Sequence, residues 1–332
     1  MSRSYSREIA ELPRTFQCVL SADTQRIESL LARMAGRSAF YVASGGALAV
    51  ARLSSDLHSK WLGAMATAVT PLEYVGLNTG NGALVAFSAR AKHRDLDLAL
   101  REARAHRSSP ITVLTFRVPE RYELQARAPV EFLTLPVVAA DGFLATNSVL
   151  LMAGLITKAH LAIRGNDLPD TLPWLAKSWN PLDSLRPLGV ILHAPPTAAV
   201  AIDLEARLSE TGLTQTQVTD YRNFAHGRHR GFQVMSSNCS VIAIIHPSNK
   251  ALIEETLGEL PKDVHLVKLE TALAGFPGVL DLLVASMKIT ETTMPIKAAP
   301  MAVNAAPVQS QRDSCDRATP CILAAPASAS MG

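Results

Sequence analysis

The chain has 332 residues, of which 48% are hydrophobic and 18% are charged. This composition supports a large buried core and excludes a chain that is disordered throughout. The 32 Lys and Arg residues barely exceed the 29 Asp and Glu residues, and the formal charge of +3 lacks the strongly basic face of a nucleic-acid binder. We therefore expect two globular domains, at about 150 residues each, and no nucleic-acid partner.

The four cysteines are too few for a disulfide scaffold and lack the CxxC spacing of a zinc site, so we expect a cytoplasmic protein. The first residues mix Arg and Glu and contain no apolar stretch, so no secretory signal is expected. The longest apolar stretch, 148–163, is too short to span a bilayer and contains Lys158 and His160. It predicts a buried helix, and we expect no membrane partner.

The first half of the chain alternates apolar runs with segments of helical period. Short continuous apolar runs are typical of strands that are covered on both faces in a parallel sheet, and they predict strands over 39–43, 83–87, 111–116 and 131–135. Apolar residues that recur every three or four positions predict helices over 23–36, 47–58, 96–106 and 143–163. Strands that alternate with helices indicate a doubly wound parallel sheet.

The pattern restarts after a proline-rich and tryptophan-containing stretch. It predicts strands and helices, in order, over 188–193, 198–210, 240–245, 249–258, 264–269 and 278–288. The last segment is rich in Ala and Pro and has no apolar period, so we expect it not to pack. The prediction is an α/β fold of two tandem doubly wound parallel-sheet subdomains with a disordered C-terminal tail. The expected parts are subdomain 1–165, linker 166–187, subdomain 188–290 and tail 291–332.

Two loops follow predicted strands in the first half, where ligands bind in open parallel sheets. Ser44-Gly45-Gly46 would let the backbone approach an anion, and the loop 88–94 adds cations next to a hydroxyl. An ordinary tight turn and a solvated run of charges remain as alternatives. Neither loop matches the dinucleotide fingerprint or the P-loop. The candidate binding residues are Ser44, Gly45, Ser88, Arg90, Lys92 and His93.

The densest polar cluster of the second half lies over 219–229. Arg222, Asn223 and His226 are its candidate functional residues, and a salt-bridged surface loop is the alternative. His226 and His229 are three residues apart, but no third ligand is evident and Arg228 between them would repel a cation. We therefore expect no metal site and no other cofactor.

These loops and their order resemble the sugar isomerase (SIS) superfamily over residues 25–290. The similarity is to the isomerase domain of glucosamine-6-phosphate synthase, in which a helix with Lys-x-x-Glu precedes a His-Gly-Pro motif. Here Glu210 lies sixteen residues before His226, and Arg207 stands at the Lys position. The resemblance implies two SIS-type domains, a homodimer, and binding of a sugar phosphate or nucleotide sugar.

The same resemblance implies aldose–ketose isomerisation through an enediolate. Glu210 would move the proton, Arg207 would stabilise the enediolate, and His226 would open the sugar ring. For Glu210 and His226 to act as one unit, the intervening loop should fold back over the helix end. A SIS module that senses a ligand without converting it is the alternative.

This sequence departs from the family pattern at positions where basic residues replace uncharged ones. The family's phosphate loop is Ser-x-Ser-Gly-x-Thr, whereas here Arg90 stands at the second Ser, Ala91 at the Gly and His93 at the Thr. Arg228 replaces the Pro of the His-Gly-Pro motif. Hydroxyl donors have thus been exchanged for cations, which can still bind an anion through charge-assisted hydrogen bonds.

Overall fold

The structure is a computed structural model. It describes residues 4–77, 80–119, 130–137, 140–177, 185–231 and 236–293. The predicted tail therefore lies almost entirely outside the described residues. Residues 4–293 belong to one compact unit, so the division into separate subdomains stays a prediction.

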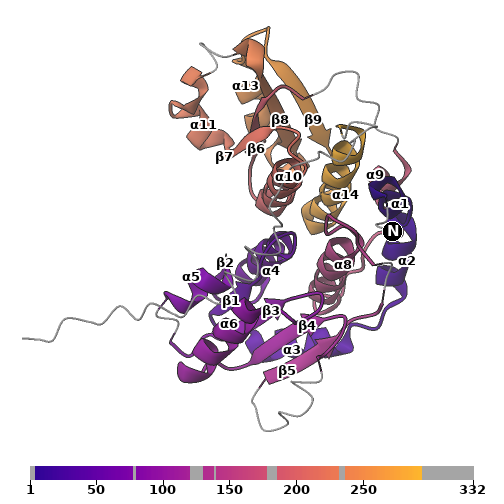
Figure 1. Cartoon of the computed structure of the whole chain (residues 1–332), viewed down its shortest axis with the longest axis vertical. Helices are drawn as coiled ribbons and strands as arrows, with labels where there is room; N and C mark the ends of the chain where they lie inside the picture. The colour runs from indigo at the N-terminus through magenta and orange to yellow at the C-terminus, as the bar shows by residue number, and fades with distance from the viewer. Residues whose placement is uncertain are drawn as a thin grey trace, which may run out of the picture. The chain divides into compact units, whose positions relative to one another are not determined.

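The first half forms a five-stranded parallel sheet (Figure 1). Three of its strands are buried along their whole length or nearly so, as their continuous apolar sequences predict. The register is unbroken, with Ala39 opposite both Ala66 and Ala83. In spatial order the strands are β2 (Ala66–Val69), β1 (Ala39–Val42), β3 (Ala83–Phe87), β4 (Ile111–Thr115) and β5 (Val130–Thr134).

The second half forms a separate four-stranded parallel sheet. Its spatial order is β7 (Gln215–Asp220), β6 (Leu188–His193), β8 (Cys239–Ile245) and β9 (His265–Glu270). This order repeats that of the first four strands of the first sheet, because in both cases the second strand lies outside the first and the third and fourth follow on the other side. The expected parallel α/β architecture is confirmed.

In both halves, helices connect consecutive strands in the same order along the chain. Those of the first half are α1 (Tyr5–Ala10), α2 (Leu12–Ser21), α3 (Gln25–Met34), α4 (Ala47–Trp61), α5 (Pro71–Val75), α6 (Arg94–Ala105) and α8 (Asn147–Ala162). The short α9 (Pro173–Ala176) follows. The second half contains α10 (Ala198–Glu210), α11 (Tyr221–Ala225), the 3-10 helix η1 (Arg228–Gly231), α13 (Lys250–Gly258) and α14 (Gly275–Thr293). Two more 3-10 helices are η2 (Ser236–Asn238) and η3 (Pro247–Asn249).

One hydrophobic core joins the two sheets. Alternate side chains of β3, such as Val85, pack with α2, α3, α4 and α8, and those of β6, such as Ile191, pack with α10 and α14. All of these belong to a single cluster of buried side chains. The outer faces have their own smaller cores, under α5 and α6 in the first half and under α11 and α13 in the second. The halves are therefore bound together by shared burial.

Polar contacts from the chain's N-terminal helix add to this connection. The Tyr5 hydroxyl on α1 donates to the Met287 carbonyl on α14, at 2.9 Å. Within the segment expected to be a linker, the Trp174 backbone N–H donates to the buried Asp281 carboxylate, also of α14, at 2.7 Å. The long C-terminal helix thus contacts segments from the start and the middle of the chain.

Two boundaries differ from the prediction. Helix α14 continues to Thr293, so the segment 291–332 does not begin as an unpacked tail. The helix is buried on nearly all sides, and this burial includes Ile289 and Thr290, beyond the end of the predicted helix 278–288. The polar segment 219–229, predicted to be a loop or the start of a helix, contains the end of β7, the short helix α11 and the first residues of η1, so it differs from the prediction by its strand end.

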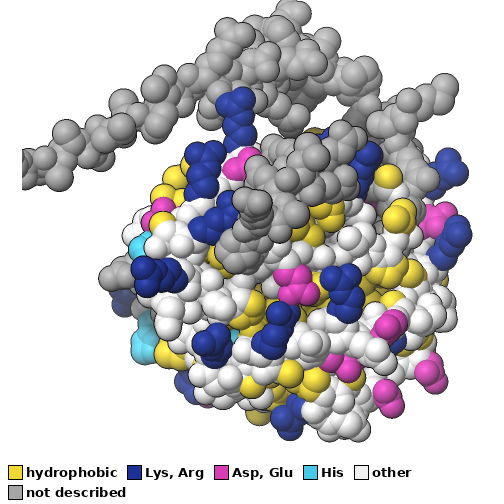
Figure 2. All heavy atoms as spheres, turned by 90° about the horizontal axis from the view of Figure 1, so that it is seen from below, with side chains coloured by type: hydrophobic (Ala, Val, Ile, Leu, Met, Phe, Trp, Pro, Cys, Tyr) yellow, Lys and Arg dark blue, Asp and Glu magenta, His cyan; other side chains and the backbone are white. Residues whose placement is uncertain are grey.

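Surface composition bears on the expected partners. On the face shown in Figure 2, Lys and Arg side chains are interspersed with acidic and apolar ones, so this face carries charges of both signs. At the β5 edge of the first sheet, Arg26 and Arg33 both contact the Glu131 carboxylate, at 3.8 and 2.5 Å. In the described part of the chain, no helix combines the length and apolar character needed to cross a membrane.

His160 lies fully buried on α8, inside the shared core. Its Nδ1 is 2.9 Å from the Ile156 carbonyl, and its Nε2 is buried without a hydrogen-bond partner among the described residues. Burial, which outweighs the opposing hydrogen bond to the Ile156 carbonyl and is aided by the nearby His58, lowers the pKa of His160 to about 4. The imidazole is therefore neutral in the folded protein at pH 7.

Acid should destabilise the protein through this histidine. The pKa is about 6.5 in the unfolded chain and about 4 in the folded one, so the unfolded chain binds the extra proton between these values. The contribution of His160 to the free energy of unfolding should fall by about 2 kcal/mol from pH 7 to pH 5. Urea unfolding at both pH values should show a smaller pH dependence in His160→Gln. An unchanged dependence would contradict this assignment.

Candidate functional site

The first sheet carries a pocket of about 430 Å³ at the carboxyl ends of β1 and β3. The carboxyl ends of parallel strands meet at one edge, so the loops that follow β1 and β3 come together there. The start of α8 forms the facing wall through Ala145, Ser148 and Val149. Of the predicted binding residues, the structure brings five into this lining: Ser44, Gly45, Ser88, Arg90 and His93.

The loop after β1 is shaped by its two glycines. Gly45 has a φ of +58°, in the left-handed region that favours glycine. At Gly46 a Cβ atom would lie 2.8 Å from the Ala145 Cβ, so only glycine lets this loop approach the wall of the pocket. Ser44 is exposed beside them, next to the N-terminus of the 15-residue helix α4. The tight-turn interpretation is correct, and the turn also lines the pocket.

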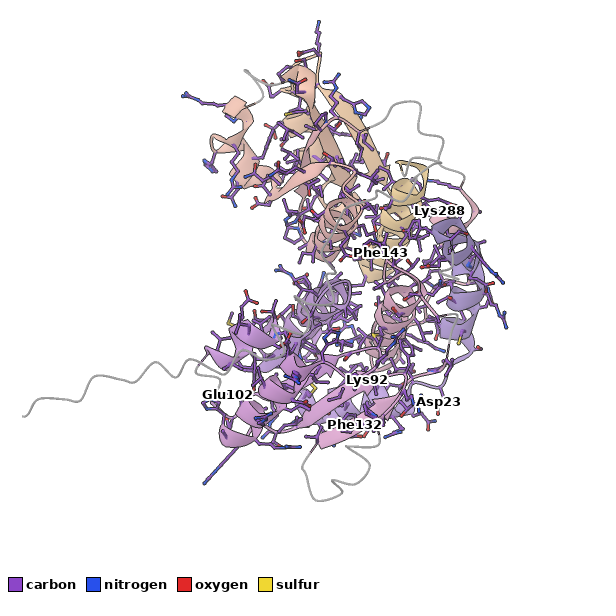
Figure 3. The ribbon with its side chains drawn as sticks, in the orientation of Figure 1. Asp23, Lys92, Glu102, Phe132, Phe143 and Lys288 are labelled. Atoms are coloured by element: carbon purple, nitrogen blue, oxygen red, sulfur yellow. The ribbon has the colours of Figure 1, made fainter. Side chains whose placement is uncertain are left out.

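The loop after β3 divides its basic side chains between the pocket and the surface. The Ser88 hydroxyl accepts a hydrogen bond from the Ala91 backbone N–H, at 3.1 Å. Arg90 and His93 are exposed side chains that line the pocket. Lys92 is exposed and is not among the lining residues, although it lies in the same half of the molecule (Figure 3). The alternative interpretation of this loop as a solvated run of charges therefore fits Lys92, but not Arg90 and His93, which line the pocket.

Two polar residues of the pocket lining were not predicted from the sequence, Asp95 and Ser148. Asp95 contributes a carboxylate from the first turn of α6, within the basic run. Ser148 lies in the first turn of α8, where the Asp141 carboxylate accepts hydrogen bonds from the Ser148 backbone N–H, at 3.1 Å, and from its hydroxyl. Asp95 stood in a visible charge cluster, whereas nothing in the apolar sequence around Ser148 indicated a pocket.

The catalytic role expected for Arg207 does not agree with its surroundings. The side chain is only 3% exposed. Its Nε donates to Asp203 Oδ2 at 2.7 Å, and its other nitrogens donate to the Tyr5 hydroxyl at 3.2 Å and the Ala145 carbonyl at 2.6 Å. Burial works to lower the pKa of Arg207, but Asp203 and Tyr5 more than offset it and raise the pKa. All three of its nitrogens are committed to the protein, so Arg207 positions the pocket wall.

Glu210 lies one turn beyond Arg207, at the exposed C-terminal end of α10. Because Arg207 binds the carbonyl of Ala145, which lines the pocket, this end of α10 is held close to the pocket wall. Partial burial raises the pKa of the Glu210 carboxyl, while Arg207 lowers it. Glu210 is not itself among the lining residues.

Glu210 and His226 are not paired within the chain. The whole of β7 lies between them, and its six residues span about 20 Å at about 3.3 Å per residue. Glu210 precedes the start of this strand, and His226 follows α11 beyond its end, where it is exposed. The segment does turn back along α10, but as a strand of the second sheet, so the expectation that it brings His226 to Glu210 at the helix end is wrong.

The other two candidates of the second half also lie away from the first pocket. Asn223 donates from its backbone N–H to the Asp220 carboxylate, at 2.9 Å, and its side-chain amide contacts the same group. This carboxylate caps α11, so Asn223 is part of a helix cap. Arg222 lines a different pocket, between α11 and α13. Across the described ranges, no three His, Cys, Asp or Glu side chains are placed to hold a metal ion.

Solved structures share this fold. The C-terminal domain of glucosamine-fructose-6-phosphate aminotransferase from Francisella tularensis has a TM-score of 0.66 and 13% identity, covering 88% of this chain and 95% of that one. Tagatose-6-phosphate ketose/aldose isomerase from Escherichia coli has a TM-score of 0.61 and 14% identity, covering 89% and 94%. Glucosamine-6-phosphate deaminase from Thermotoga maritima has 0.65 and 14%, covering 87% and 93%.

No protein-family model matches the sequence, and no curated protein matches it. At the identities above, the similarity shows the fold alone. The chain has an α/β fold with parallel sheets, which it shares with these solved structures.

Proposed function

We propose that the pocket at the carboxyl edge of the first sheet binds a phosphorylated sugar or a related anionic carbohydrate derivative, and that the protein interconverts its aldose and ketose forms. The observation that supports this most is the joint lining of one pocket by the Ser44-Gly45 turn, Ser88 and the Arg90 cation. The phosphosugar names of the structural neighbours agree with this choice.

The chemistry of the lining suits a phosphoryl group. Hydroxyls and the start of a helix provide donors and a positive dipole, which together favour an anion. Arg90 adds a guanidinium, whose hydrogen bonds to phosphate are charge-assisted. Asp95 on the same side would repel a second anion and accept a hydroxyl, so it suits the sugar part of the ligand.

Arg90→Gln should weaken binding of a sugar phosphate such as glucosamine 6-phosphate by about tenfold or more, as expected for the loss of one charged hydrogen bond. Lys92→Gln is the matched control, because it removes the same charge from the same loop outside the pocket lining. Isothermal titration of both variants would measure the difference. Equal affinities in the two variants would show that the loop acts only through its net charge.

The proposed reaction moves a proton between the first two carbons through an enediolate. Glu210 is the proposed base, since partial burial raises the pKa of its carboxyl towards the range that suits proton transfer. Arg207 cannot stabilise the enediolate directly and instead fixes the end of α10 against Ala145. It is thus a positioning residue.

His226 would open the sugar ring only from a second copy of the chain, because it lies beyond the far end of β7 from Glu210. The function therefore includes a homodimer, in which 1–165 and 188–290 form two SIS-type halves joined by 166–187. Sedimentation at micromolar concentration should show a dimer. A monomer that still converts the sugar would exclude His226 from the reaction.

A SIS module that binds its ligand without converting it is the second candidate. It is favoured by one observation, the burial of Arg207 where the family has a Lys that the enediolate could use. Assaying isomerisation of every sugar phosphate that stabilises the protein separates the two functions. Binding without turnover would establish the sensing module.

A further inference from the structure

A second pocket of about 430 Å³ lies in the second half of the chain, between α11 and α13. None of its lining residues belongs to the first pocket. Its lining residues Arg222 and His229 belong to the polar cluster 219–229, and the proposed function assigns no role to either. Its main lining residues are Arg222, Phe224, His229, Leu252, Glu255 and Glu259.

The two walls of this pocket carry opposite charges. Arg222 on α11 and His229 on η1 form one wall, and Glu255 and Glu259 form the other, on α13 and at its C-terminal end. Arg222, Glu255 and Glu259 are exposed, and none of them forms an ion pair with another described residue. The nearby Glu254 differs, because it contacts Lys250 at 3.9 Å. The facing charges are therefore available to a ligand.

The floor between these walls is apolar and preformed. Phe224 is buried, and Leu252 and Leu260 are half-buried. His229 is fixed over the floor, with its ring edge-on to Phe224 at 6.3 Å between centroids and its Nδ1 3.3 Å from the Phe224 carbonyl. Pockets of this size with an apolar floor and a few convergent polar groups are typical of small-molecule sites.

The repeat between the two halves provides an internal comparison. In the first half the equivalent helices are α5 and α6, which pack against each other more extensively than α11 and α13 do. Tyr74 occupies the place of Phe224, and its hydroxyl lies 3.2 Å from the Ser108 hydroxyl. The architecture therefore does not require an opening at this position.

We propose that the groove between α11 and α13 is a second binding site, for a small ligand with an anionic group at one end, a cationic group at the other and an apolar body between them. Arg222 binds the anion, His229 borders it, and Glu255 and Glu259 bind the cation. The apolar body covers the floor, where each square ångström removed from water stabilises the complex by about 25 cal/mol. This site does not depend on the function of the first pocket.

The test uses ω-amino acids as probes on the full chain. Isothermal titration compares 4-aminobutanoate, 6-aminohexanoate and 8-aminooctanoate, with hexanoate and hexylamine as analogues that carry one charge each. At least one ω-amino acid should bind, and the singly charged analogues should bind about tenfold more weakly, since each loses one charged contact. Failure of all three ω-amino acids to bind, or equal binding of the singly charged analogues, would overturn the proposal.

Substitutions locate the binding. Arg222→Gln should weaken binding of the best probe by about tenfold, and so should Glu255→Gln or Glu259→Gln. Arg228→Gln and Glu254→Gln are the matched controls, because each removes the same charge from a neighbouring position outside this pocket. Unchanged affinity in the first group, or an equal loss in the controls, would show that the probe binds elsewhere and would overturn the proposal.

Discussion

Glu210→Gln is expected to lower the rate of isomerisation of a bound sugar phosphate by about 10²-fold or more, the scale of general base catalysis. Affinity for the sugar should be unchanged, because glutamine keeps the shape and the hydrogen-bonding capacity of glutamate. The wild-type rate should fall as the pH decreases, since partial burial raises the pKa of this carboxyl and the base must be ionised. The variant should lose this acid limb.

The matched control for Glu210 is Glu205→Gln on the same helix. Glu205 accepts a hydrogen bond from the Ser209 hydroxyl, at 2.9 Å, and carries the same charge a turn and a half away. Its removal should leave the rate within about twofold, because general base catalysis depends on hydrogen-bond reach. Equal rate losses in both variants would indicate an effect of net charge, and an unchanged rate in Glu210→Gln would exclude it as the base.

Arg207→Met is expected to lower the free energy of unfolding by about 3–5 kcal/mol, as is found when one partner of a buried ion pair is removed. The Asp203 carboxylate is 1% exposed, and among the described residues it would keep only the Ser286 hydroxyl as a side-chain hydrogen-bond partner. Its Oδ1 has no hydrogen-bond partner among these residues even in the wild type. Urea unfolding at pH 7 measures the change. A loss below about 1 kcal/mol would contradict the buried-pair assignment.

The double variant Asp203→Leu/Arg207→Met separates the ion pair from packing. Replacing both charges by apolar groups of similar volume is often close to neutral, so the double variant should recover most of the stability that Arg207→Met loses. Sugar affinity should remain reduced in both variants, because each lacks the hydrogen bond to the Ala145 carbonyl that holds the pocket wall. Full recovery of affinity in the double variant would exclude this positioning role.

The strands that the sequence predicts most plainly are those buried on both faces. β3, β4 and β8 are predominantly apolar and are buried at every residue. Such a run predicts a strand from its own sequence, without knowledge of the neighbouring strands. β2 and β7 are half-exposed edge strands that lack adjacent large apolar residues, and they were missed. The opposite edge strands β5 and β9 were predicted, because Phe132-Leu133 and Leu266-Val267 form short apolar pairs. In β7 the sequence Gln-Thr-Gln-Val-Thr-Asp resembles a polar loop.

The N-terminal helices were also missed, although a signal was present. Leu12, Phe16 and Val19 recur at helical spacing and are completely buried on α2. The sequence analysis treated this region only as a possible secretory signal. Reading the same period there as elsewhere in the chain would have predicted a helix.

The first pocket could be predicted in outline because parallel strands place consecutive loops at one edge. The position of Arg207 could not. Its partner Asp203 lies four residues away on the same helix, but the contacts to Tyr5 and Ala145 join positions that are 202 and 62 residues distant in sequence. Spacing alone likewise suggested that Glu210 and His226 meet, whereas the segment 211–225 between them contains a whole strand.

A crystal structure of the protein with a stabilising sugar phosphate tests the central claim most directly. The account predicts a phosphoryl group in the first pocket, within hydrogen-bond distance of the Ser44 and Ser88 hydroxyls or the Arg90 guanidinium, and the sugar carbons towards the end of α10. A phosphoryl group bound elsewhere, with the first pocket occupied by water in the same crystals, would contradict it.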